Sequence, residues 1–148
     1  MLKAWQRIEQ MLFFKLIYWI ARLGLGLAFI ASGLRKIPGV HFTALPDTNP
    51  VGAFFSLMES MPLYWHFIGY YQIIAGLLAL LNRWAALSGV LMLPVTVNIF
   101  LVSLALNMQG TPFITSLMLL GNIYYMLWHR EQYAGVFSKS DMSKLKLR

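Results

Sequence analysis

Four apolar segments, each long enough to cross a lipid bilayer, take up most of this chain. They cover about residues 16–37, 63–81, 84–106 and 111–129, and each has about the 20 residues that a helix needs to cross hydrocarbon. Only short turns separate the last three segments. Charged residues make up 11% of the 148 residues, which is too few to cover a soluble domain of this size. The sequence therefore predicts an all-α integral membrane protein, an up-down bundle of four transmembrane helices.

Basic residues are distributed unequally between the two predicted sides of the membrane. Those on one side are Lys3, Arg7, Lys15, Arg83, Arg130 and the lysines near the C-terminus, and those on the other are Arg35 and Lys36. Because cytoplasmic loops are enriched in Lys and Arg, we expect both termini in the cytoplasm and the connection over residues 40–62 outside. The expected parts are a basic amphipathic lead-in at the interface (1–15), a four-span membrane domain (16–130) and a basic cytoplasmic tail (131–148).

The connection between the first two spans carries a helix start signal. In Asn49-Pro50, Asn suits the N-cap and Pro suits the first helical position. The next residues, VGAFFSLMESM, predict a short helix with its Phe and Leu side chains against the membrane and Glu59 outward. An interfacial or re-entrant helix and a plain surface loop are equally good interpretations of this segment.

Three side-chain amides lie inside the predicted spans, at Gln72, Asn98 and Asn122. At 1.5 Å per residue each is about 12–15 Å from the outer end, so the three share one layer. Ser32 lies near this layer and Lys36 above it. Convergence of these groups would form a polar pocket, open to the outside, for a small anionic or carbonyl-bearing ligand. The candidate ligand-binding residues are Arg22, Ser32, Arg35, Lys36, Gln72, Asn98 and Asn122.

Helical spacing places neighbours beside two of the amides. Gln72 shares a face with Trp65, Gly69, Gly76 and Ala79, and Asn122 shares one with Thr115, Met118, Tyr125 and His129. Either face could point inward. Structural roles are the alternative for all these polar residues, because intramembrane Asn and Gln often hydrogen-bond between helices for about 0.6–2 kcal/mol. Arg22 equally suits snorkelling or a structural partner, and Arg35 and Lys36 suit anchoring at the interface.

Residues suited to catalysis are sparse, and we identify no catalytic residue. None of the five acidic residues lies within a span, and the chain has no Cys. His41, His66 and His129 have no second His at helical spacing, so we expect neither a metal site nor a bis-His haem pair. The net charge of +7 comes largely from residues that flank apolar segments, so the expected partner is the lipid bilayer rather than nucleic acid.

Three stretches resemble the DoxX-like family of small four-helix membrane proteins. They are Arg22-Leu-Gly-Leu-Gly-Leu-Ala-Phe, Gly33-Leu-Arg-Lys36 and Gln72-Ile-Ile-Ala-Gly76-Leu-Leu, with Arg83 after the last. The resemblance covers roughly residues 22–129 and implies a protein of the bacterial cytoplasmic membrane. Founding relatives are linked to a thiosulfate:quinone oxidoreductase, which implies a quinone-facing or redox-subunit role by analogy. Many relatives carry Glu where this chain has Gln72, so proton chemistry assigned to that acid does not carry over.

Our first hypothesis is a membrane subunit that binds a quinone-like or other small ligand and assists a soluble or membrane redox partner. Without a redox centre of its own, it would be part of an oxidoreductase rather than a self-sufficient enzyme. A quinone is the candidate cofactor. The alternatives are a non-catalytic membrane scaffold or interaction protein and a small-molecule or lipid carrier, and a homo-oligomer is compatible with each.

Overall fold

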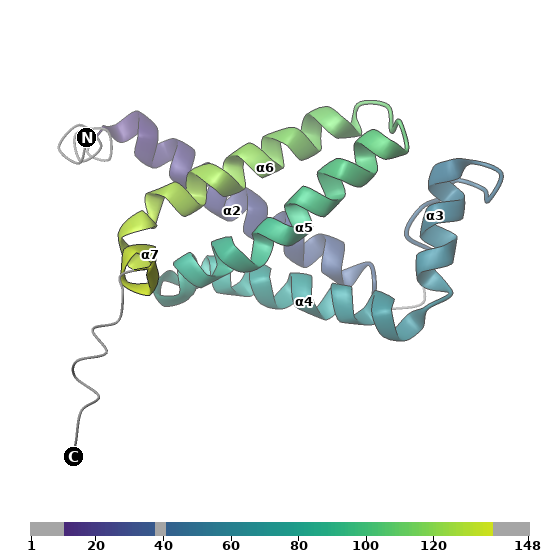
Figure 1. The fold of residues 1–148 in the computed structure, drawn as a ribbon, viewed down its shortest axis with the longest axis horizontal. Coiled ribbons are helices and arrows are strands. Elements are labelled where there is room, and N and C mark those ends of the chain that lie inside the picture. The colour runs from purple at the N-terminus through teal and green to yellow at the C-terminus, as the bar shows by residue number, and fades with distance from the viewer. Residues whose placement is uncertain (1–10, 38–40, 138–148) are drawn as a thin grey trace, which may run out of the picture.

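Four long α-helices build the body of the protein, and short helices lie at its two ends (Figure 1). The long ones are α2 (Leu12–Leu34), α4 (Pro62–Leu80), α5 (Ala85–Ala105) and α6 (Thr111–Trp128). The short ones are α3 (Pro50–Glu59), the 3-10 helix η1 (Asn82–Trp84) and α7 (Arg130–Phe137). The computed structural model describes residues 11–37 and 41–137, and no β-strand occurs in these ranges. The prediction of an all-α fold is therefore confirmed.

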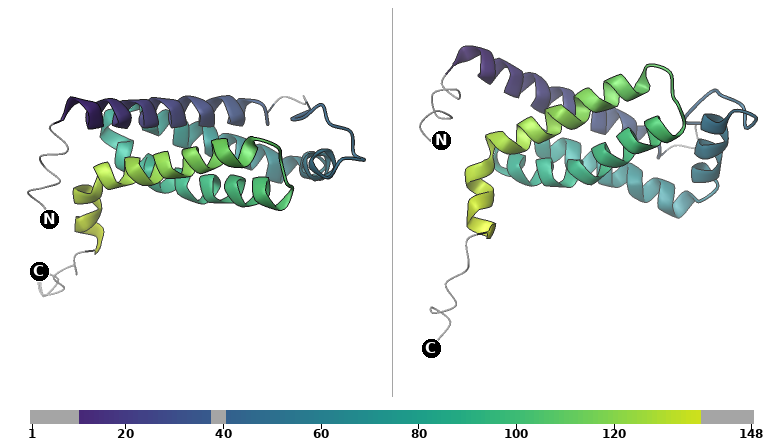
Figure 2. Two further views of the ribbon diagram at one scale, coloured as in Figure 1. Left: turned by 90° about the horizontal axis from the view of Figure 1, so that it is seen from above. Right: turned by 45° about the horizontal axis from the view of Figure 1, so that its top comes forward.

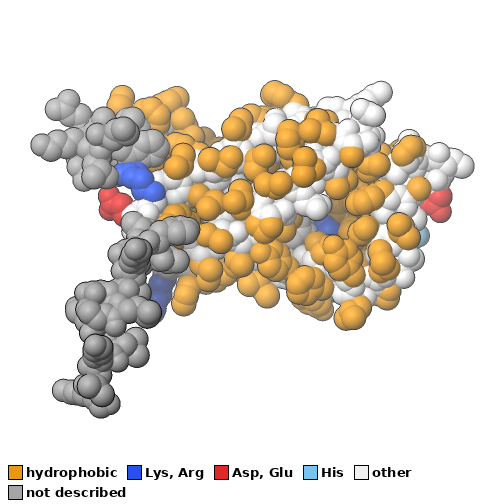
Figure 3. Space-filling view, in the orientation of Figure 1, with side chains coloured by type: hydrophobic (Ala, Val, Ile, Leu, Met, Phe, Trp, Pro, Cys, Tyr) orange, Lys and Arg blue, Asp and Glu red, His pale blue; other side chains and the backbone are white. Residues whose placement is uncertain are grey.

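Three of the long helices, α2, α4 and α5, have the length and composition needed to cross a membrane. Large hydrophobic side chains lie exposed along them, and on the face drawn in Figure 3 such side chains cover the middle of the molecule, with acidic ones at its two ends. Helix α6 has 18 residues, but its Thr, Asn and Tyr side chains make it less apolar than the other three. The protein is therefore a membrane protein with several apolar helices.

The long helices form a closed ring. Helix α2 packs on α4, α4 on α5, α5 on α6, and α6 on α2. The start of α2, the α4–α5 connection and α7 lie at one end, and α3 lies across the other (Figures 1 and 2). Consecutive long helices run antiparallel. Short connections, η1 and a turn, join α4 to α5 and α5 to α6. In that turn Asn107 and Gly110 adopt positive φ angles of 47° and 74°, which these residue types tolerate well.

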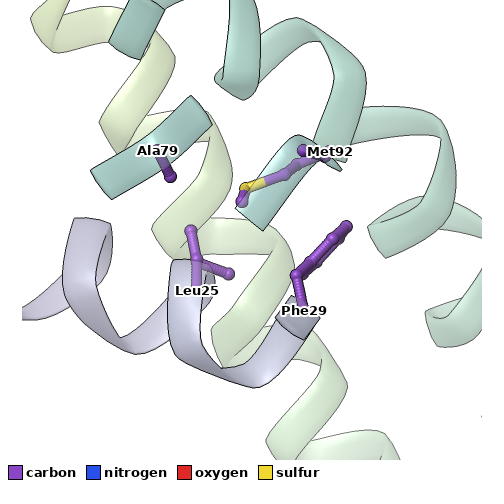
Figure 4. Close-up of a cluster of buried hydrophobic side chains, with 5 residues drawn as sticks. Leu25, Phe29, Ala79 and Met92 are labelled. Atoms are coloured by element: carbon purple, nitrogen blue, oxygen red, sulfur yellow. The ribbon is translucent and has the colours of Figure 1, made fainter. Parts of the chain in front are cut away.

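Apolar side chains fill the centre of the ring. Leu25 and Phe29 of α2 meet Ala75 and Ala79 of α4 and Met92 of α5, and Figure 4 shows four of these pointing toward one another. A second buried cluster, Tyr18, Ala85 and Tyr125, lies toward the end that carries α7. Where these two clusters lie, the space between the helices is therefore filled by a packed core.

Two pairs of glycines bring α2 and α4 into close contact. A Cβ added to Gly33 would lie 2.6 Å from the Gly69 carbonyl oxygen, and one added to Gly76 would lie 2.6 Å from the Gly26 carbonyl oxygen. A side-chain carbon does not come this close to a carbonyl oxygen, so only glycine fits at these positions. The pairing fixes the register of the two antiparallel helices, and it places the C-terminal end of α2 beside Gly69.

The helix bounds differ from the predicted spans by a few residues. Helix α2 begins at Leu12 and ends at Leu34, whereas we expected a span from about residue 16 to residue 37. The chain tightens after Leu34, because the Lys36 N–H bonds to the Gly33 carbonyl, three residues back, at 3.0 Å. Most of the expected lead-in, and the tail from residue 138 onward, lie outside the described residues. Helix α7 was not predicted.

The short helix after Asn49 is confirmed. The Asn49 side chain accepts a hydrogen bond from the Val51 N–H at 2.9 Å, and Pro50 occupies the first helical position. The Glu59 side chain is 20% exposed and contacts the segment before α3. Its carboxylate accepts the Phe42 N–H at 2.6 Å and lies 2.9 Å from His41 Nδ1. Phe42 lies in a segment without regular secondary structure, so its backbone N–H needs an acceptor from elsewhere, and Glu59 supplies it.

Candidate functional site

Lys36 is a cation enclosed at the end of the bundle where α3 lies. It lies two residues beyond the end of α2, and it is 6% exposed. Its Nζ donates to the Ser32 carbonyl oxygen at 3.0 Å and to the Ser32 Oγ at 2.9 Å. The ring centroids of Phe42 and Trp65 lie 4.5 and 5.0 Å from Nζ. Burial, followed by the nearby charge of Arg35, lowers the pKa of Lys36 to about 8.

Gln72 extends this polar arrangement from α2 to α4. The Ser32 Oγ donates to Gln72 Oε1 at 3.4 Å, so Ser32 contacts both Lys36 and Gln72. Gln72 is 1% exposed. Among the described residues its amide nitrogen has no hydrogen-bond acceptor, and this atom is not one of the fully enclosed unpaired atoms, so it keeps some solvent contact. We call Ser32, Lys36 and Gln72, with Phe42 and Trp65 as aromatic walls, the Lys36 site.

The segment before α3 covers the Lys36 site at this end of the bundle. The Phe42 ring packs on Phe55 of α3 and Trp65 of α4, with centroid distances of 4.5 and 5.5 Å. Beside it lies an open hollow of about 680 Å³, lined by residues 41–45 together with Arg35, Asp47, Ser56 and Glu59. Phe42 therefore contacts both the hollow and Lys36.

Arg22 lies in a separate cluster toward the other end of the bundle. It is 2% exposed, its Nε donates to the Ala79 carbonyl at 2.6 Å, and its Nη2 donates to the Leu80 carbonyl at 3.2 Å. These carbonyls end α4, where a helix has no partners of its own for them. Nη1 donates to the Tyr18 hydroxyl at 3.2 Å. Arg22 therefore caps the C-terminus of α4, in keeping with the structural interpretation of this cation.

Asn122 joins two helices, and its hydrogen bonds do not involve any residue of the Lys36 site. It is fully buried, its Nδ2 donates to the Gly89 carbonyl at 3.2 Å, and its Oδ1 accepts from Thr96 Oγ1 at 3.2 Å. Asn122 therefore holds α6 to α5. The predicted inward faces are confirmed for both helices, because Trp65, Gly69, Gly76 and Ala79 are buried with Gln72, and Thr115 and Tyr125 with Asn122.

Asn98 corrects the expectation that the three amides line one pocket. Its side chain is exposed on the outer face of α5. Thr96, two residues earlier, is buried against Asn122. Two residues turn a helix by about 200°, so Asn98 points away from the ring. Of the seven predicted residues, the structure thus brings Ser32, Lys36 and Gln72 together, places Arg35 at the hollow, and separates Arg22, Asn98 and Asn122.

The aromatic walls were missed as site residues. Helical spacing predicts that Trp65 shares a face with Gly69 and Gln72, but Trp65 was not included among the candidate ligand-binding residues. Phe42 lies in an irregular segment with no periodic signal. Within residues 11–37 and 41–137, no three side chains among His, Asp and Glu gather as a metal-binding group.

Comparisons with known proteins identify relatives of this chain. A family model described as DoxX matches residues 17–104, which is more than half of the chain. "Uncharacterized protein YwoB" of Bacillus subtilis (strain 168) is 32% identical over 128 residues, covering 82% of this chain and 82% of YwoB. No solved structure is significantly similar. The family match includes all three polar residues of the Lys36 site and ends before α6.

Proposed function

This chain belongs to the DoxX family, and from that premise we propose that it is a ligand-binding subunit of a membrane redox system. The ligand is a small molecule with an exposed oxygen acceptor, and a quinone is the leading candidate. The Lys36 site binds it, and a soluble or membrane oxidoreductase is the partner.

We propose further that all four long helices cross the bacterial cytoplasmic membrane, with both termini in the cytoplasm. Support comes from the closed ring, in which α6 packs on both α2 and α5 like a fourth span. It also comes from charge, since Lys15, Arg83 and Arg130 lie at the end that holds the α4–α5 connection and α7. The hollow and α3 are then on the outside.

One observation carries the ligand proposal: Lys36 is buried without a carboxylate. In the described residues neither ion pair includes it, and its partners are Ser32 and two aromatic rings. An ammonium with three donors is thus left with hydrogen-bonding capacity beside the unpaired amide nitrogen of Gln72. Two donors with spare capacity in one place favour a ligand that brings an oxygen acceptor.

The residues of the site fit a quinone. Lys36 and Gln72 would donate to a carbonyl oxygen, and the Lys36 hydrogen bond would be of the strong, charge-assisted kind. Phe42 and Trp65 would pack on the ring. A bound quinone would supply an acceptor for two electrons from the partner enzyme. The chain's own contribution is to bind and orient the ring, exclude water and hold a positive charge at one oxygen.

Titration of the purified full-length chain in lipid nanodiscs with a short-tailed naphthoquinone tests this proposal by calorimetry. We expect Lys36→Met and Gln72→Leu to weaken binding at least about 10-fold, since each removes a hydrogen bond worth about 1.4 kcal/mol or more. Binding should also weaken as the pH rises through about 8, because Lys36 loses its proton there. Below that pH it is charged and binding is strongest.

Lys15→Met is the matched control, because Lys15 is an exposed cation near the start of the same helix. It should bind the quinone as the wild type does. Unchanged binding in Lys36→Met would refute the site. If both site variants unfold in nanodiscs, the polar contacts of Ser32 and Gln72 are structural instead, and the scaffold alternative is favoured.

A further inference from the structure

Asn98 places a polar amide on a surface that otherwise faces hydrocarbon. Helix α5 ends at Ala105, so Asn98 lies seven residues, about 10 Å, inside that end. Its side chain is exposed, and none of the described residues hydrogen-bonds to it. The other side-chain amide in the three apolar spans, Gln72, is buried. Asn98 thus stands out as a group whose hydrogen bonds this fold does not supply.

The residues around Asn98 form a continuous exposed face of α5. Val90, Val97 and Leu101 are 44%, 36% and 56% exposed, and Pro94 is exposed between them. Pro94 has no N–H, so the Val90 carbonyl, four residues back, lacks its helical donor. The same face therefore carries two polar groups that the helix itself does not satisfy, within apolar surroundings.

We propose that this face binds α5 of a second copy of the chain, with the two Asn98 amides hydrogen-bonded to each other. An amide carries both a donor and an acceptor, so two copies of it are complementary. A two-fold axis perpendicular to the membrane brings the same residue of each copy to the same depth. A different partner would need a polar group at that depth, whereas a second copy always has one.

This dimer is independent of the Lys36 site. Asn98 lies on α5, whereas the site is built from α2, α4 and the segment before α3. The ring leaves the Asn98 face open, because α5 packs on α4 and α6 with its other side. The proposal goes beyond the proposed function, and either can fail without the other.

The absence of Cys makes disulfide cross-linking a direct test. In native membranes treated with a mild oxidant, Asn98→Cys should give a covalent dimer, since the paired α carbons lie close to the axis within disulfide reach. The matched control is Leu27→Cys, which is 59% exposed on α2, a helix that packs on α4 and α6. It should remain monomeric. Equal cross-linking at both positions, or a cross-link from Asn98→Cys to a different protein, would overturn the proposal.

Measuring the dimer dissociation constant shows whether the Asn98 amide itself stabilises the dimer or only lies close to the contact. By single-molecule photobleaching in liposomes, Asn98→Leu should raise the dimer dissociation constant about 3- to 30-fold, as expected for one interhelical amide contact, while Asn98→Gln should retain dimers. A monomeric wild type, or a dissociation constant unchanged in Asn98→Leu, would refute the amide pairing.

Discussion

At the residue scale, the two buried cations are compensated in different ways. Arg22 donates to two backbone carbonyls that end α4 and to a tyrosine hydroxyl, so the protein itself supplies its acceptors. Lys36 has one serine and two rings around it. The first arrangement stabilises the fold, and the second leaves capacity for a ligand. Sequence alone does not separate them, because both are single cations in or next to the same apolar segment.

Arg22→Met should destabilise the protein by about 2–3 kcal/mol, the range for lost hydrogen bonds to a charged group. The reason is that the Ala79 and Leu80 carbonyls would remain in a low-dielectric environment without donors. Denaturant titration in detergent micelles measures the change. Arg35→Met is the control, since Arg35 is exposed, and it should change the free energy of unfolding by less than about 0.5 kcal/mol. Equal stability of the two variants would contradict the capping role.

At the element scale, the contact between α2 and α4 depends on glycines at matched positions. Gly26 and Gly33 of α2 lie against Gly76 and Gly69 of α4, with backbone facing backbone. Without a hydrophobic driving force between helices in lipid, such close packing is a main source of association. The same contact sets Ser32 beside Gln72, so the geometry of the Lys36 site depends on it.

Gly33→Ala should cost about 1–3 kcal/mol, the usual cost of overpacking, because the new methyl group would meet the Gly69 backbone. Gly24→Ala on the same helix is the matched control. Nothing lies within 4 Å of a Cβ there, so this change should be neutral or stabilise by up to about 1 kcal/mol. Thermal unfolding of both variants in one detergent checks the difference. If Gly33→Ala is as stable as the wild type, α2 and α4 can move apart at no cost in stability, and the close glycine contact is not required.

Periodicity and start signals were enough to predict the four long helices and the faces that Gln72 and Asn122 turn inward. Asn49-Pro50 likewise located α3. Distance along a span gives only depth, however, and it does not give rotation about the helix axis. Asn98 was therefore assigned to the wrong side of α5. Phe42 and the Glu59 contact depend on how an irregular segment folds back over α4, and local sequence carries no period from which to infer that.

At the scale of the whole molecule, the arrangement of charge is the strongest guide to how the protein sits in a membrane. The apolar surface covers the middle of the bundle in Figure 3, while α3 lies at one end and α7 at the other (Figure 2). With four crossings, Gln109 and Gln132, which flank α6, lie on opposite sides. With three, they share a side.

Single-cysteine labelling decides between these topologies. In intact cells, a membrane-impermeant maleimide should label Gln109→Cys, because the turn before α6 faces outward under the positive-inside rule. Gln132→Cys should react only after permeabilisation. Both positions are exposed, so accessibility in the folded protein is matched. Labelling of both from outside would show that α6 does not cross, and the reversed pattern would invert the orientation.

The guanidinium contact between α2 and α4 also bears on biosynthesis. Arg22 emerges from the ribosome 57 residues before the Ala79 carbonyl that accepts its shortest hydrogen bond. At translation rates of 5–20 residues per second, that interval lasts roughly 3–11 s. During this time the newly made first helix carries a charge that lipid tails cannot solvate. Water, a phospholipid headgroup or an insertion factor must therefore accompany it until its partner arrives.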